Sequence, residues 1–471
     1  MSDFSGSGIG GRAGSAALTL SAEIFSIPLD DSRYIIYAPA RRSAFVANEQ
    51  VVQSIAQLRS GSAQARGADD SLMQLLRALQ MVDAEPEVTP SAACQGGPEP
   101  ISVTLFLTTA CSLRCTYCYA SAGNTAPQFM ALETARSGID FVARNAAKRG
   151  SPYFGVDYHG GGEPTMNWGV FTGSFEYARQ KAAELHLELR SSVATNGMLS
   201  DGRIDWIVAH LRGASVSCDG LPAVHDECRQ TASGKGSSGR VMNTLRRLDA
   251  AKFPYGIRLT VTAEHIPTLA DSVEFLSREF HPTSIQIEPV YIMGRGAAER
   301  SAETDAFIEA YRAAAERAAA HGRGTNFSGA RAGTLTNHFC SVSQDNFCLS
   351  AAGNVTACFE AFDEHSPHAG QFFYGQPADG GGYVFDYHVL DHLRSQGVER
   401  RQYCRGCFAK WSCGGDCYYK WLMGRGGGEF NGSARCHVIR ELTKDQILGK
   451  IAESGGLFWR EPVSGVVSKD D

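Results

Sequence analysis

Short apolar runs and helical periodicity alternate near the start of the chain. Three runs rich in β-branched and aromatic residues predict strands, at Ile24–Pro28, Tyr34–Tyr37 and Ser43–Ala47. Apolar residues then recur at helical spacing around 51–58 and again around 72–79, with a small polar loop between them at 59–70. Residues 21–85 therefore predict a small domain in which three strands are backed by helices.

A longer alternation of strand and helix begins at residue 101. Amphipathic helical stretches such as Leu132–Ala147, Val241–Ala251 and Thr304–Ala320 separate or follow the apolar runs. The six strand-like runs are Ile101–Thr108, Tyr153–Tyr158, Leu187–Ala194, Ala214–Cys218, Tyr255–Thr262 and Ser284–Val290. Six β-then-α units predict an α/β fold, in which a parallel sheet curves into a partial barrel with helices outside. Functional loops are then expected at the carboxyl ends of the strands.

Changes in composition divide the chain further. Residues 1–20 are rich in Gly and Ser and lack the basic start and apolar block of a secretory signal, so we expect a disordered tail. A Pro- and Gly-rich linker at 86–100 precedes the barrel region at 101–325. The helical rhythm stops near 335, and residues 335–440 are rich in Cys, Gly and aromatic residues. A C-terminal segment follows at 441–471.

Charge and hydropathy exclude several partners. The 471 residues carry a formal net charge of −6 with nearly balanced acids and bases, which favours neither nucleic acid nor an anionic membrane. No apolar run approaches the roughly eighteen residues that a membrane span requires. We therefore expect a cytoplasmic protein. Its fourteen cysteines fall mostly into two groups, and in a reducing compartment such clusters indicate metal ligation or redox chemistry.

The first group of cysteines follows the first strand of the barrel region. Cys111, Cys115 and Cys118 have the spacing C-x3-C-x2-C and place three thiolates in one short loop. A cubane [4Fe–4S] cluster takes one thiolate per iron, so three thiolates leave one iron open to a substrate or cofactor. The alternative is a zinc site with a distant fourth ligand.

This loop resembles the signature of the radical S-adenosylmethionine (SAM) superfamily, and the resemblance runs through about residues 101–320. In that family the open iron binds the amino and carboxylate groups of SAM. An electron from the cluster then cleaves SAM to give a 5′-deoxyadenosyl radical, which abstracts a hydrogen from the substrate. The resemblance makes Cys111, Cys115 and Cys118 the catalytic cluster ligands and puts Tyr117 beside the cofactor.

Further motifs of that superfamily occur in the expected order at strand ends. Gly161, Gly162 and Glu163 belong to a Gly-Gly-Glu-Pro element, whose backbone and carboxylate would meet the SAM amino group. Asn196 follows the third strand in Thr-Asn-Gly. Ser217 and Arg229 resemble the S-x-D-G and Arg positions of the peptide-modifying branch, as candidates for the SAM carboxylate or ribose.

The second group of cysteines has the pattern Cys340-x12-Gly353-x4-Cys358, then Cys404-x2-Cys407-x5-Cys413-x3-Cys417, then Cys436. This pattern resembles the SPASM domain, a cysteine-rich module that holds auxiliary iron–sulfur clusters. The resemblance covers about 335–440 and implies two further [4Fe–4S] clusters, which makes three with the SAM-binding one. The implied distal ligands are Cys404, Cys407, Cys413 and Cys436. The implied proximal ligands are Cys340, Cys358 and Cys417. Zinc is the alternative for the whole set, because C-x2-C pairs are common in zinc ribbons.

Four other cysteines lie outside this pattern. Cys348 lies between Cys340 and Cys358 and either completes the proximal cluster or is a small buried hydrophobe on a strand at Asn346–Ser350. Cys94, Cys218 and Cys228 are interpreted as ordinary buried thiols. Acids near strand ends, namely Asp219, Asp226 and Glu288, identify no catalytic base, because such acids usually serve turns or helix caps.

The substrate implied by the resemblance is a peptide. SPASM enzymes mostly modify peptides or proteins, and the unit at 21–85 resembles the PqqD-like element that captures a precursor peptide by strand addition. The function predicted is the installation of a thioether, C–C or C–O crosslink in a ribosomally made precursor peptide, with a low-potential flavodoxin or ferredoxin as electron donor. The alternatives are a sulfatase-type formylglycine maturase and a non-catalytic cluster scaffold or redox sensor.

Overall fold

The computed structural model describes residues 20–461, except 22, 61–69, 85–89, 91–93, 299–302 and 426–428. Of the tail predicted at 1–20, residues 1–19 lie outside the described residues, as do most of the loop at 59–70 and much of the linker at 86–100. The chain divides into two compact units, one of residues 1–90 with 447–471 and one of residues 91–446. Among the described residues, no helix combines the length and the apolar character needed to cross a membrane.

The first unit contains a four-stranded antiparallel sheet in the order β1-β2-β3-β15. Its strands are β1 (Phe25–Pro28), β2 (Arg33–Ala38), β3 (Ser43–Asn48) and β15 (Phe458–Arg460). The first three confirm the strands predicted there. The fourth was not predicted, because a three-residue strand far away in sequence has no periodic pattern of its own.

This unit also contains the helices α1 (Glu49–Ser60) and α2 (Asp70–Ala78). Ile55 and Leu58 of α1 and Leu72 and Leu76 of α2 are buried in one core with Ile36 of the sheet. The apolar spacing that predicts these helices is therefore the face that they bury.

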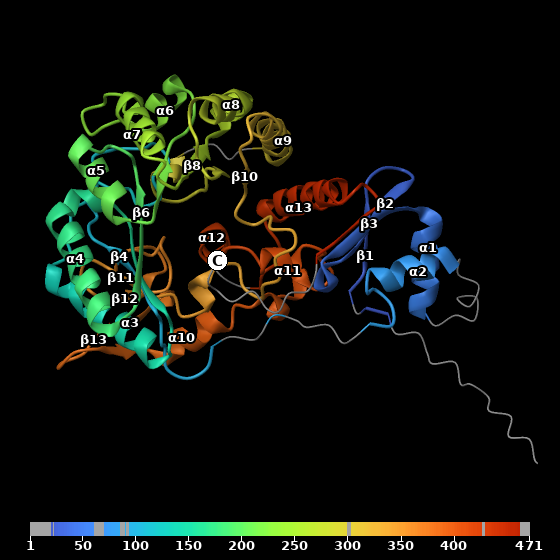
Figure 1. Cartoon of the computed structure of the whole chain (residues 1–471), viewed down its shortest axis with the longest axis horizontal. Helices are drawn as coiled ribbons and strands as arrows, with labels where there is room; N and C mark the ends of the chain where they lie inside the picture. Colours follow the sequence, from blue (N-terminus) through green and yellow to red (C-terminus); the bar gives the residue numbers. More distant parts are fainter. Residues whose placement is uncertain are drawn as a thin grey trace, which may run out of the picture. The chain divides into compact units, whose positions relative to one another are not determined.

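The second unit is built on an eleven-stranded sheet, whose central part is parallel. Six neighbouring strands follow one another in sequence order and curve into a partial barrel with the helices on its outside (Figure 1). They are β4 (Ser102–Phe106), β5 (Tyr153–His159), β6 (Glu188–Thr195), β7 (Gly213–Ser217), β8 (Tyr255–Val261) and β9 (Ile285–Pro289). All six agree with the predicted runs to within two residues, which confirms the α/β partial-barrel prediction.

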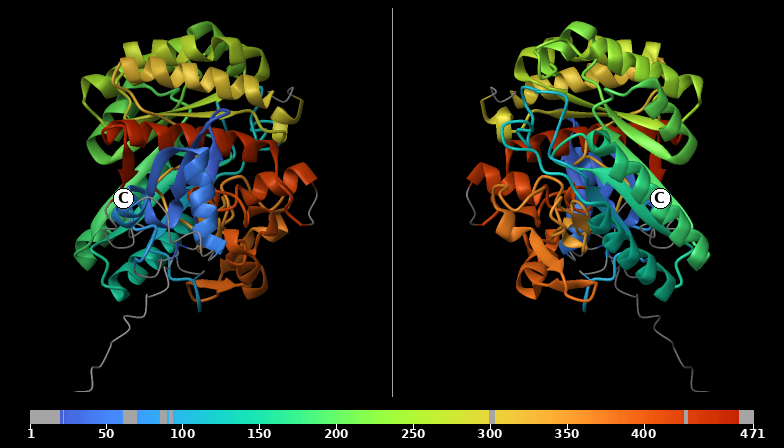
Figure 2. Two further views of the ribbon diagram at one scale, coloured as in Figure 1. Left: turned by 90° about the vertical axis from the view of Figure 1, so that its right-hand side faces the viewer. Right: turned by 90° about the vertical axis from the view of Figure 1, so that its left-hand side faces the viewer.

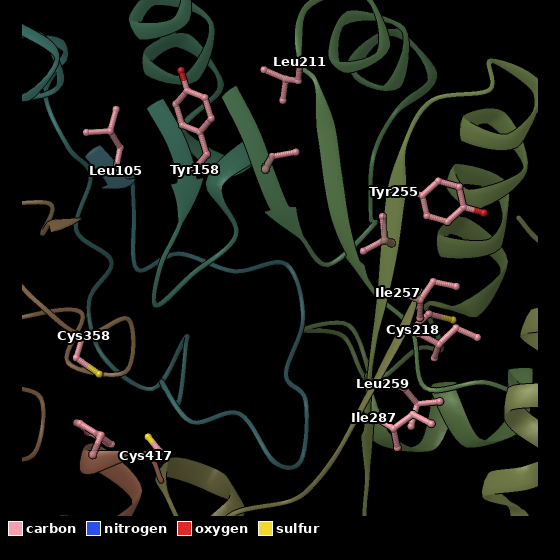
Figure 3. Close-up of a cluster of buried hydrophobic side chains, with 14 of the residues drawn as sticks. Leu105, Tyr158, Leu211, Cys218, Tyr255, Ile257, Leu259, Ile287, Cys358 and Cys417 are labelled. Carbon is pink, nitrogen blue, oxygen red and sulfur yellow. The ribbon is translucent and has the colours of Figure 1, made fainter. Parts of the chain in front are cut away.

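Helices follow each of these strands and cover the outer face of the sheet, as two further views show (Figure 2). They are α3 (Leu132–Lys148), α4 (Trp168–Leu185), α5 (Asp201–His210), α6 (Pro222–Cys228), α7 (Ser238–Ala250), α8 (Leu269–Glu279) and α9 (Thr304–Ala320). Side chains such as Leu105, Ile257 and Leu259 fill the core of this unit (Figure 3). Burial of this apolar surface drives the barrel to form.

The cysteine-rich region extends the same sheet. β10 (Thr325–Asn326) pairs with β9, and β11 (Cys348–Leu349) pairs in parallel with β4 at the other edge. An antiparallel series of β12 (Val355–Thr356), β13 (Phe373–Pro377) and β14 (Tyr383–Phe385) continues from β11. The region also has helices α10 (Tyr387–Arg394), α11 (Lys410–Cys413), α12 (Tyr418–Arg425) and α13 (Ala434–Glu453). The sequence predicts no regular helices in this region, and that prediction is wrong. These helices are too short or too polar to show a clear apolar periodicity.

Candidate functional site

One cavity of about 530 Å³ collects residues from the barrel and from the cysteine-rich region. Its barrel side is lined by loops at the carboxyl ends of β4 to β9, where functional loops are expected. Six of the predicted ligands line it: Cys111, Cys115, Cys118, Cys340, Cys358 and Cys417. Figure 3 shows Cys358 and Cys417 side by side. Two groups of thiols that are more than two hundred residues apart in sequence therefore face one cavity.

The loop that carries the first three thiols is fixed by backbone hydrogen bonds. The N–H of Arg114 donates to the carbonyl of Gln230 (2.6 Å), and the N–H of Thr116 donates to the carbonyl of Cys228 (2.9 Å). Burial, with smaller contributions from Glu163 and the neighbouring cysteines, raises the pKa of the Cys111 thiol to about 12. Such thiols lose their protons when a cationic centre compensates the charge, which is what an iron–sulfur cluster provides.

Backbone amides point at several of these sulfurs. Three of the thiols accept a hydrogen bond from the backbone N–H two residues further along the chain. The pairs are Cys111 with Leu113, Cys340 with Val342 and Cys358 with Glu360. Hydrogen bonds to cysteine sulfur stabilise the thiolate and tune iron–sulfur clusters. The Cys218 sulfur receives the same contact from the N–H of Gly220, although Cys218 does not line this cavity. The contact is therefore compatible with cluster ligation but does not by itself distinguish ligands from other thiols.

The Gly-Gly-Glu element is pressed against the cysteine loop. A Cβ atom at Gly162 would lie 2.3 Å from the carbonyl oxygen of Ala110, so only glycine fits there. The Glu163 carboxylate is buried and accepts hydrogen bonds from the side chains of Thr165 (2.7 Å) and Thr195 (3.0 Å) and from the N–H of Asn196 (2.7 Å). Glu163 is thus held rigidly at the cavity wall.

The predicted SAM-contacting residues all line this cavity: Tyr117, Gly161, Gly162, Glu163, Asn196, Ser217 and Arg229. Asn196 extends its side-chain amide toward the Cys111 sulfur, at 3.5 Å. Arg229 is predicted to bind a carboxylate of the cofactor, but the structure pairs its guanidinium with both oxygens of Asp219. That carboxylate also accepts a hydrogen bond from the Tyr117 hydroxyl.

The acids near strand ends have structural partners, as expected. Asp226 accepts the N–H groups of Ser237 and Ser238 at the start of α7, both at 2.7 Å. Burial alone would raise the pKa of Glu288, but the charges of Arg435, Lys420 and Arg258 outweigh burial and lower it to about 2. Neither acid is therefore a candidate base.

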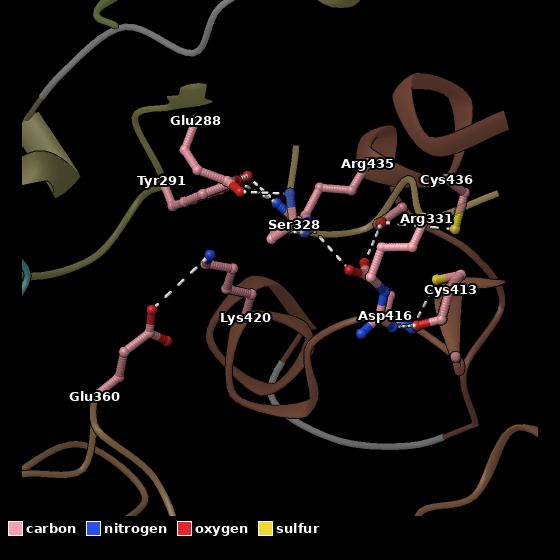
Figure 4. Close-up of polar contacts among 12 residues, drawn as sticks. Glu288, Tyr291, Ser328, Arg331, Glu360, Cys413, Asp416, Lys420, Arg435 and Cys436 are labelled. Carbon is pink, nitrogen blue, oxygen red and sulfur yellow. Dashed lines mark hydrogen bonds and ion pairs between the residues drawn. The ribbon is translucent and has the colours of Figure 1, made fainter. Parts of the chain in front are cut away.

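The implied distal set forms a second site. Cys404, Cys407, Cys413 and Cys436 line one small cavity together with Asp416. The Cys413 sulfur accepts the N–H of Asp416 at 3.1 Å, and Arg435 holds the Asp416 carboxylate with a 2.8 Å ion pair (Figure 4). Four convergent thiols fit the donor set of a closed [4Fe–4S] cluster.

The remaining cysteines differ in their surroundings. Cys348 lies on β11, is fully buried and is not among the residues that line the large cavity. Its sulfur accepts a hydrogen bond from the Asn346 side chain at 3.1 Å. Cys218 and Cys228 are buried as predicted. The prediction that Cys94 is buried is wrong, because the Pro- and Gly-rich linker around it offers no packed element to cover a side chain.

Several cavity residues have no sequence motif. His159 at the end of β5 stacks on Phe359 with ring centroids 4.8 Å apart, and burial lowers the pKa of His159 to about 4. Glu360 and Lys420 form an ion pair at 3.9 Å between two cysteine-bearing segments. In the sequence, the one feature that could have indicated these two residues is their closeness to predicted cluster ligands. Glu360 comes two residues after Cys358, and Lys420 comes three residues after Cys417.

The donor sets can be compared with the clusters that they would hold. In the part of the chain that the structure describes, no group of three or more His, Cys, Asp or Glu side chains forms a site for a metal ion. A [4Fe–4S] cluster instead spreads its thiolates over four irons. Three thiols on one side of the large cavity, three on the other and four around the small one fit three such clusters in donor type.

Curated proteins resemble part of the chain. The sporulation killing factor maturation protein SkfB of Bacillus subtilis is 30% identical over 183 residues, which are 37% of this chain and 39% of that protein. The mycofactocin maturase MftC of Mycolicibacterium smegmatis is 30% identical over 210 residues, which are 43% of this chain and 48% of that protein. The match thus spans less than half the length of either relative.

Solved structures share the fold over a larger part. The structure of anSMEcpe with bound AdoMet has a TM-score of 0.60 at 15% identity and covers 75% of this chain and 99% of its own. Streptococcus suis SuiB bound to the precursor peptide SuiA has a TM-score of 0.52 at 12% identity, covering 88% of this chain and 99% of its own. The model of the radical SAM superfamily matches residues 105–276, which include the cysteine loop, the Gly-Gly-Glu element and Arg229. This chain therefore carries a radical SAM domain.

Proposed function

We propose that this chain is a radical SAM enzyme that modifies a ribosomally made precursor peptide at carbon, by installing a thioether, C–C or C–O crosslink or a related modification. The observation that carries the proposal is the single cavity that six cysteines share with Glu163. It would bring a SAM-binding cluster, a substrate and a proximal auxiliary cluster within one enclosed space. Similarity to two proteins named as maturation enzymes supports a peptide substrate.

Cys111, Cys115 and Cys118 would hold the SAM-binding cluster, and Gly161–Glu163 would hold the amino group of SAM. When bound, these groups supply a 5′-deoxyadenosyl radical that removes a hydrogen atom from the peptide. The rigid hydrogen-bonding of Glu163 keeps its carboxylate in place for an ammonium group. With the cofactor and the peptide bound, the cavity walls would limit the access of water to a reactive substrate species.

The cysteine-rich region would serve electron transfer. Cys340, Cys358 and Cys417 would hold the proximal auxiliary cluster, and Cys404, Cys407, Cys413 and Cys436 the distal one. Cys348 remains a candidate for the proximal cluster. Crosslinking or desaturation removes electrons from the peptide, and these thiols would hold the groups that accept them. A low-potential flavodoxin or ferredoxin would supply the first electron. The reaction belongs in the cytoplasm, where thiols stay reduced.

The first unit would capture the peptide as a PqqD-like element. Among the described residues, β1 is an edge strand with no partner on its outer side, as strand addition requires, and helices α1 and α2 cover one face of that sheet. An extended precursor segment would gain backbone hydrogen bonds at such an edge. Binding of a labelled precursor to wild-type protein and to a chain that lacks the first unit tests this role.

The decisive experiment is anaerobic reconstitution with iron and sulfide, followed by dithionite and SAM. We expect 5′-deoxyadenosine above background, and we expect none from the Cys111→Ala/Cys115→Ala/Cys118→Ala variant. Cys218→Ala is the matched control, because Cys218 is buried away from the cavity and should not affect the product. Absence of 5′-deoxyadenosine from reconstituted wild-type protein would overturn the proposal.

Co-expression with a candidate precursor from a neighbouring gene identifies the chemistry. A mass loss of two hydrogens from the peptide would support crosslinking or desaturation. Conversion of a cysteine or serine in a neighbouring sulfatase to formylglycine would instead establish the maturase alternative.

A further inference from the structure

The proximal auxiliary site has three cavity-lining thiols for a cluster of four irons. Cys340, Cys358 and Cys417 line the large cavity, whereas Cys348 does not. The sulfur of Cys348 is engaged by the side chains of Asn346 and Thr104, inside the sheet formed by β11 and β4. The fourth iron is then either open or bound by another side chain that faces this cavity.

Glu360 faces the cavity beside the three thiols. Its Oε1 atom pairs with the Lys420 ammonium at 3.9 Å. Its Oε2 atom is buried and has no hydrogen-bond partner among the described residues. A buried carboxylate oxygen without a partner is costly, so this atom calls for a positively charged partner in the folded protein.

The charge of Glu360 reaches all three proximal thiols. The Glu360 carboxylate lies close enough to Cys340, Cys358 and Cys417 to act on each of them electrostatically. Mutual repulsion between a carboxylate and three thiolates is unfavourable in the absence of a cation. A cationic iron centre would compensate the negative charge of the three thiolates and the carboxylate.

Lys420 fixes the orientation of the Glu360 carboxylate. Its ammonium lies 3.7 Å from the centroid of the Tyr291 ring and turns one carboxylate oxygen toward itself (Figure 4). The second oxygen is thereby left unpaired. The backbone N–H of Glu360 donates toward the Cys358 sulfur and that of Lys420 toward the Cys417 sulfur, so both residues are anchored to the thiols that they accompany.

We propose that Glu360, through Oε2, is the fourth protein ligand of the proximal auxiliary cluster, with Lys420 as its positioning residue; this rests on the cluster assignment proposed above. Cys348 is then a buried structural thiol. A carboxylate is a harder ligand than a thiolate, which makes one iron of this cluster chemically distinct from the other three.

The test is spectroscopic and uses protein that retains only auxiliary clusters. The Cys111→Ala/Cys115→Ala/Cys118→Ala variant is produced in a glutamate auxotroph fed with glutamate that carries ¹³C at the side-chain carboxyl. It is reduced with dithionite and examined by ¹³C electron–nuclear double resonance. We expect a ¹³C hyperfine coupling that disappears in Glu360→Gln, whereas the iron content of about eight atoms per chain for two cubanes is retained.

Matched variants keep the interpretation unambiguous. Glu364→Gln should retain the coupling, because the Glu364 carboxylate accepts hydrogen bonds from Ser350 (2.7 Å) and Asn354 (2.8 Å). Lys420→Met should weaken the coupling, because it removes the cation that orients Glu360. Lys420→Arg keeps a cation at this position and should retain the coupling. Cys348→Ala should leave the electron paramagnetic resonance spectrum unchanged. If Glu360→Gln lowers iron binding, Glu360→Asp is produced with aspartate that carries ¹³C at its side-chain carboxyl. A ¹³C coupling in that variant, absent from wild-type protein labelled in the same way, still supports ligation at position 360.

Two outcomes would overturn the proposal. The first is a protein with both auxiliary clusters but without a ¹³C coupling, or with one that survives Glu360→Gln. The second is a changed proximal spectrum in Cys348→Ala, which would make that thiol the ligand. A protein that binds no iron at its C-terminal cysteines would instead refute the cluster assignment itself, so the two failures are distinguishable by iron analysis.

Discussion

Arg229 donates two hydrogen bonds to Asp219, from Nε at 2.8 Å and from the terminal nitrogen at 3.2 Å. Both side chains are almost wholly buried. Asp219 follows β7, and Arg229, which lines the cavity, follows α6. The Tyr117 hydroxyl from the cysteine loop donates to the same carboxylate, and the backbone N–H of Thr260 donates to it at 3.1 Å. One ion pair thus joins the cluster loop to two neighbouring strands of the barrel.

Removal of one partner of this pair is expected to be costly. Asp219→Ala leaves the Arg229 cation buried without compensation, which destabilises a protein by about 3–5 kcal/mol. Anaerobic urea unfolding of the reconstituted protein measures this loss. The control is Asp30→Ala at the exposed Arg33–Asp30 pair, where solvent screening predicts little change. Equal midpoints for the two variants would contradict the structural role of the Asp219–Arg229 pair.

Gly162→Ala is expected to impair SAM binding. The new Cβ would stand 2.3 Å from the Ala110 carbonyl, and backbone cannot yield as a flexible side chain does. Overpacking of this kind costs about 1–3 kcal/mol, so we expect a loss of SAM affinity of about five- to 150-fold in equilibrium dialysis. Gly169→Ala at the start of α4 is the control, since no described atom lies within 4 Å of its Cβ. Unchanged affinity in Gly162→Ala would contradict the close approach.

Local sequence patterns predict the parts of this site that are local in space. The spacing from Cys111 to Cys118 and the Gly161–Glu163 element each lie within one loop, so their chemistry is readable from a few residues. The six barrel strands were predictable because each buries an apolar run of its own. These features account for the predicted fold and for part of the cavity lining on the barrel side.

Contacts between segments that are far apart in the sequence could not be predicted from local patterns. Arg435 bridges Glu288 on β9 and Asp416 in the cysteine-rich region, and no spacing in the sequence announces this link. Arg229 belongs to a recognisable motif, but the motif does not show that its guanidinium pairs with Asp219. That pairing depends on how α6 folds back toward the end of β7. Glu360 was likewise hidden, because a single acid after a cysteine resembles any surface glutamate until its burial is known.

Iron analysis should divide the cysteines into ligands and bystanders. Each [4Fe–4S] cluster contributes four irons, so removal of Cys404 and Cys407 should lower the content from about twelve to about eight per chain. Cys228→Ala should leave about twelve, because Cys228 is buried outside both cysteine-lined cavities. Equal iron content in the two variants would contradict the assignment of the distal set.

Stability should fall on mild acidification because of His225. Burial lowers the pKa of this histidine to about 4, and its ring accepts the N–H of Asp219 while it contacts the Ser237 hydroxyl at 3.0 Å. A lowered pKa means that the folded state prefers the neutral ring, so this contribution is complete above pH 6.5 and is lost as the pH falls toward 4.

The size of this effect can be measured directly. Between pH 7.5 and 5.5 the histidine should cost about 1.4 kcal/mol of unfolding free energy. His159, whose pKa is also lowered to about 4, adds a similar amount. The difference in urea midpoint between the two pH values should therefore shrink by about half in His225→Gln. An unchanged difference would mean that His225 is protonated in the folded protein.

The C-terminal strand should be a stabilising part of the first unit. Trp459 on β15 is 3% exposed and stacks on Tyr37 of β2 with ring centroids 6.3 Å apart. Trp459→Ala removes this contact, and truncation of a buried tryptophan costs about 3–5 kcal/mol. Hydrogen exchange of the β3 amides, which pair with β15 over Ser43–Phe45, should then accelerate. Phe458→Ala is the matched control, because the neighbouring Phe458 side chain is 38% exposed and should contribute much less. Equal exchange rates in the two variants would show that β15 adds no stability through Trp459, and that the three strands predicted from the sequence suffice for the unit.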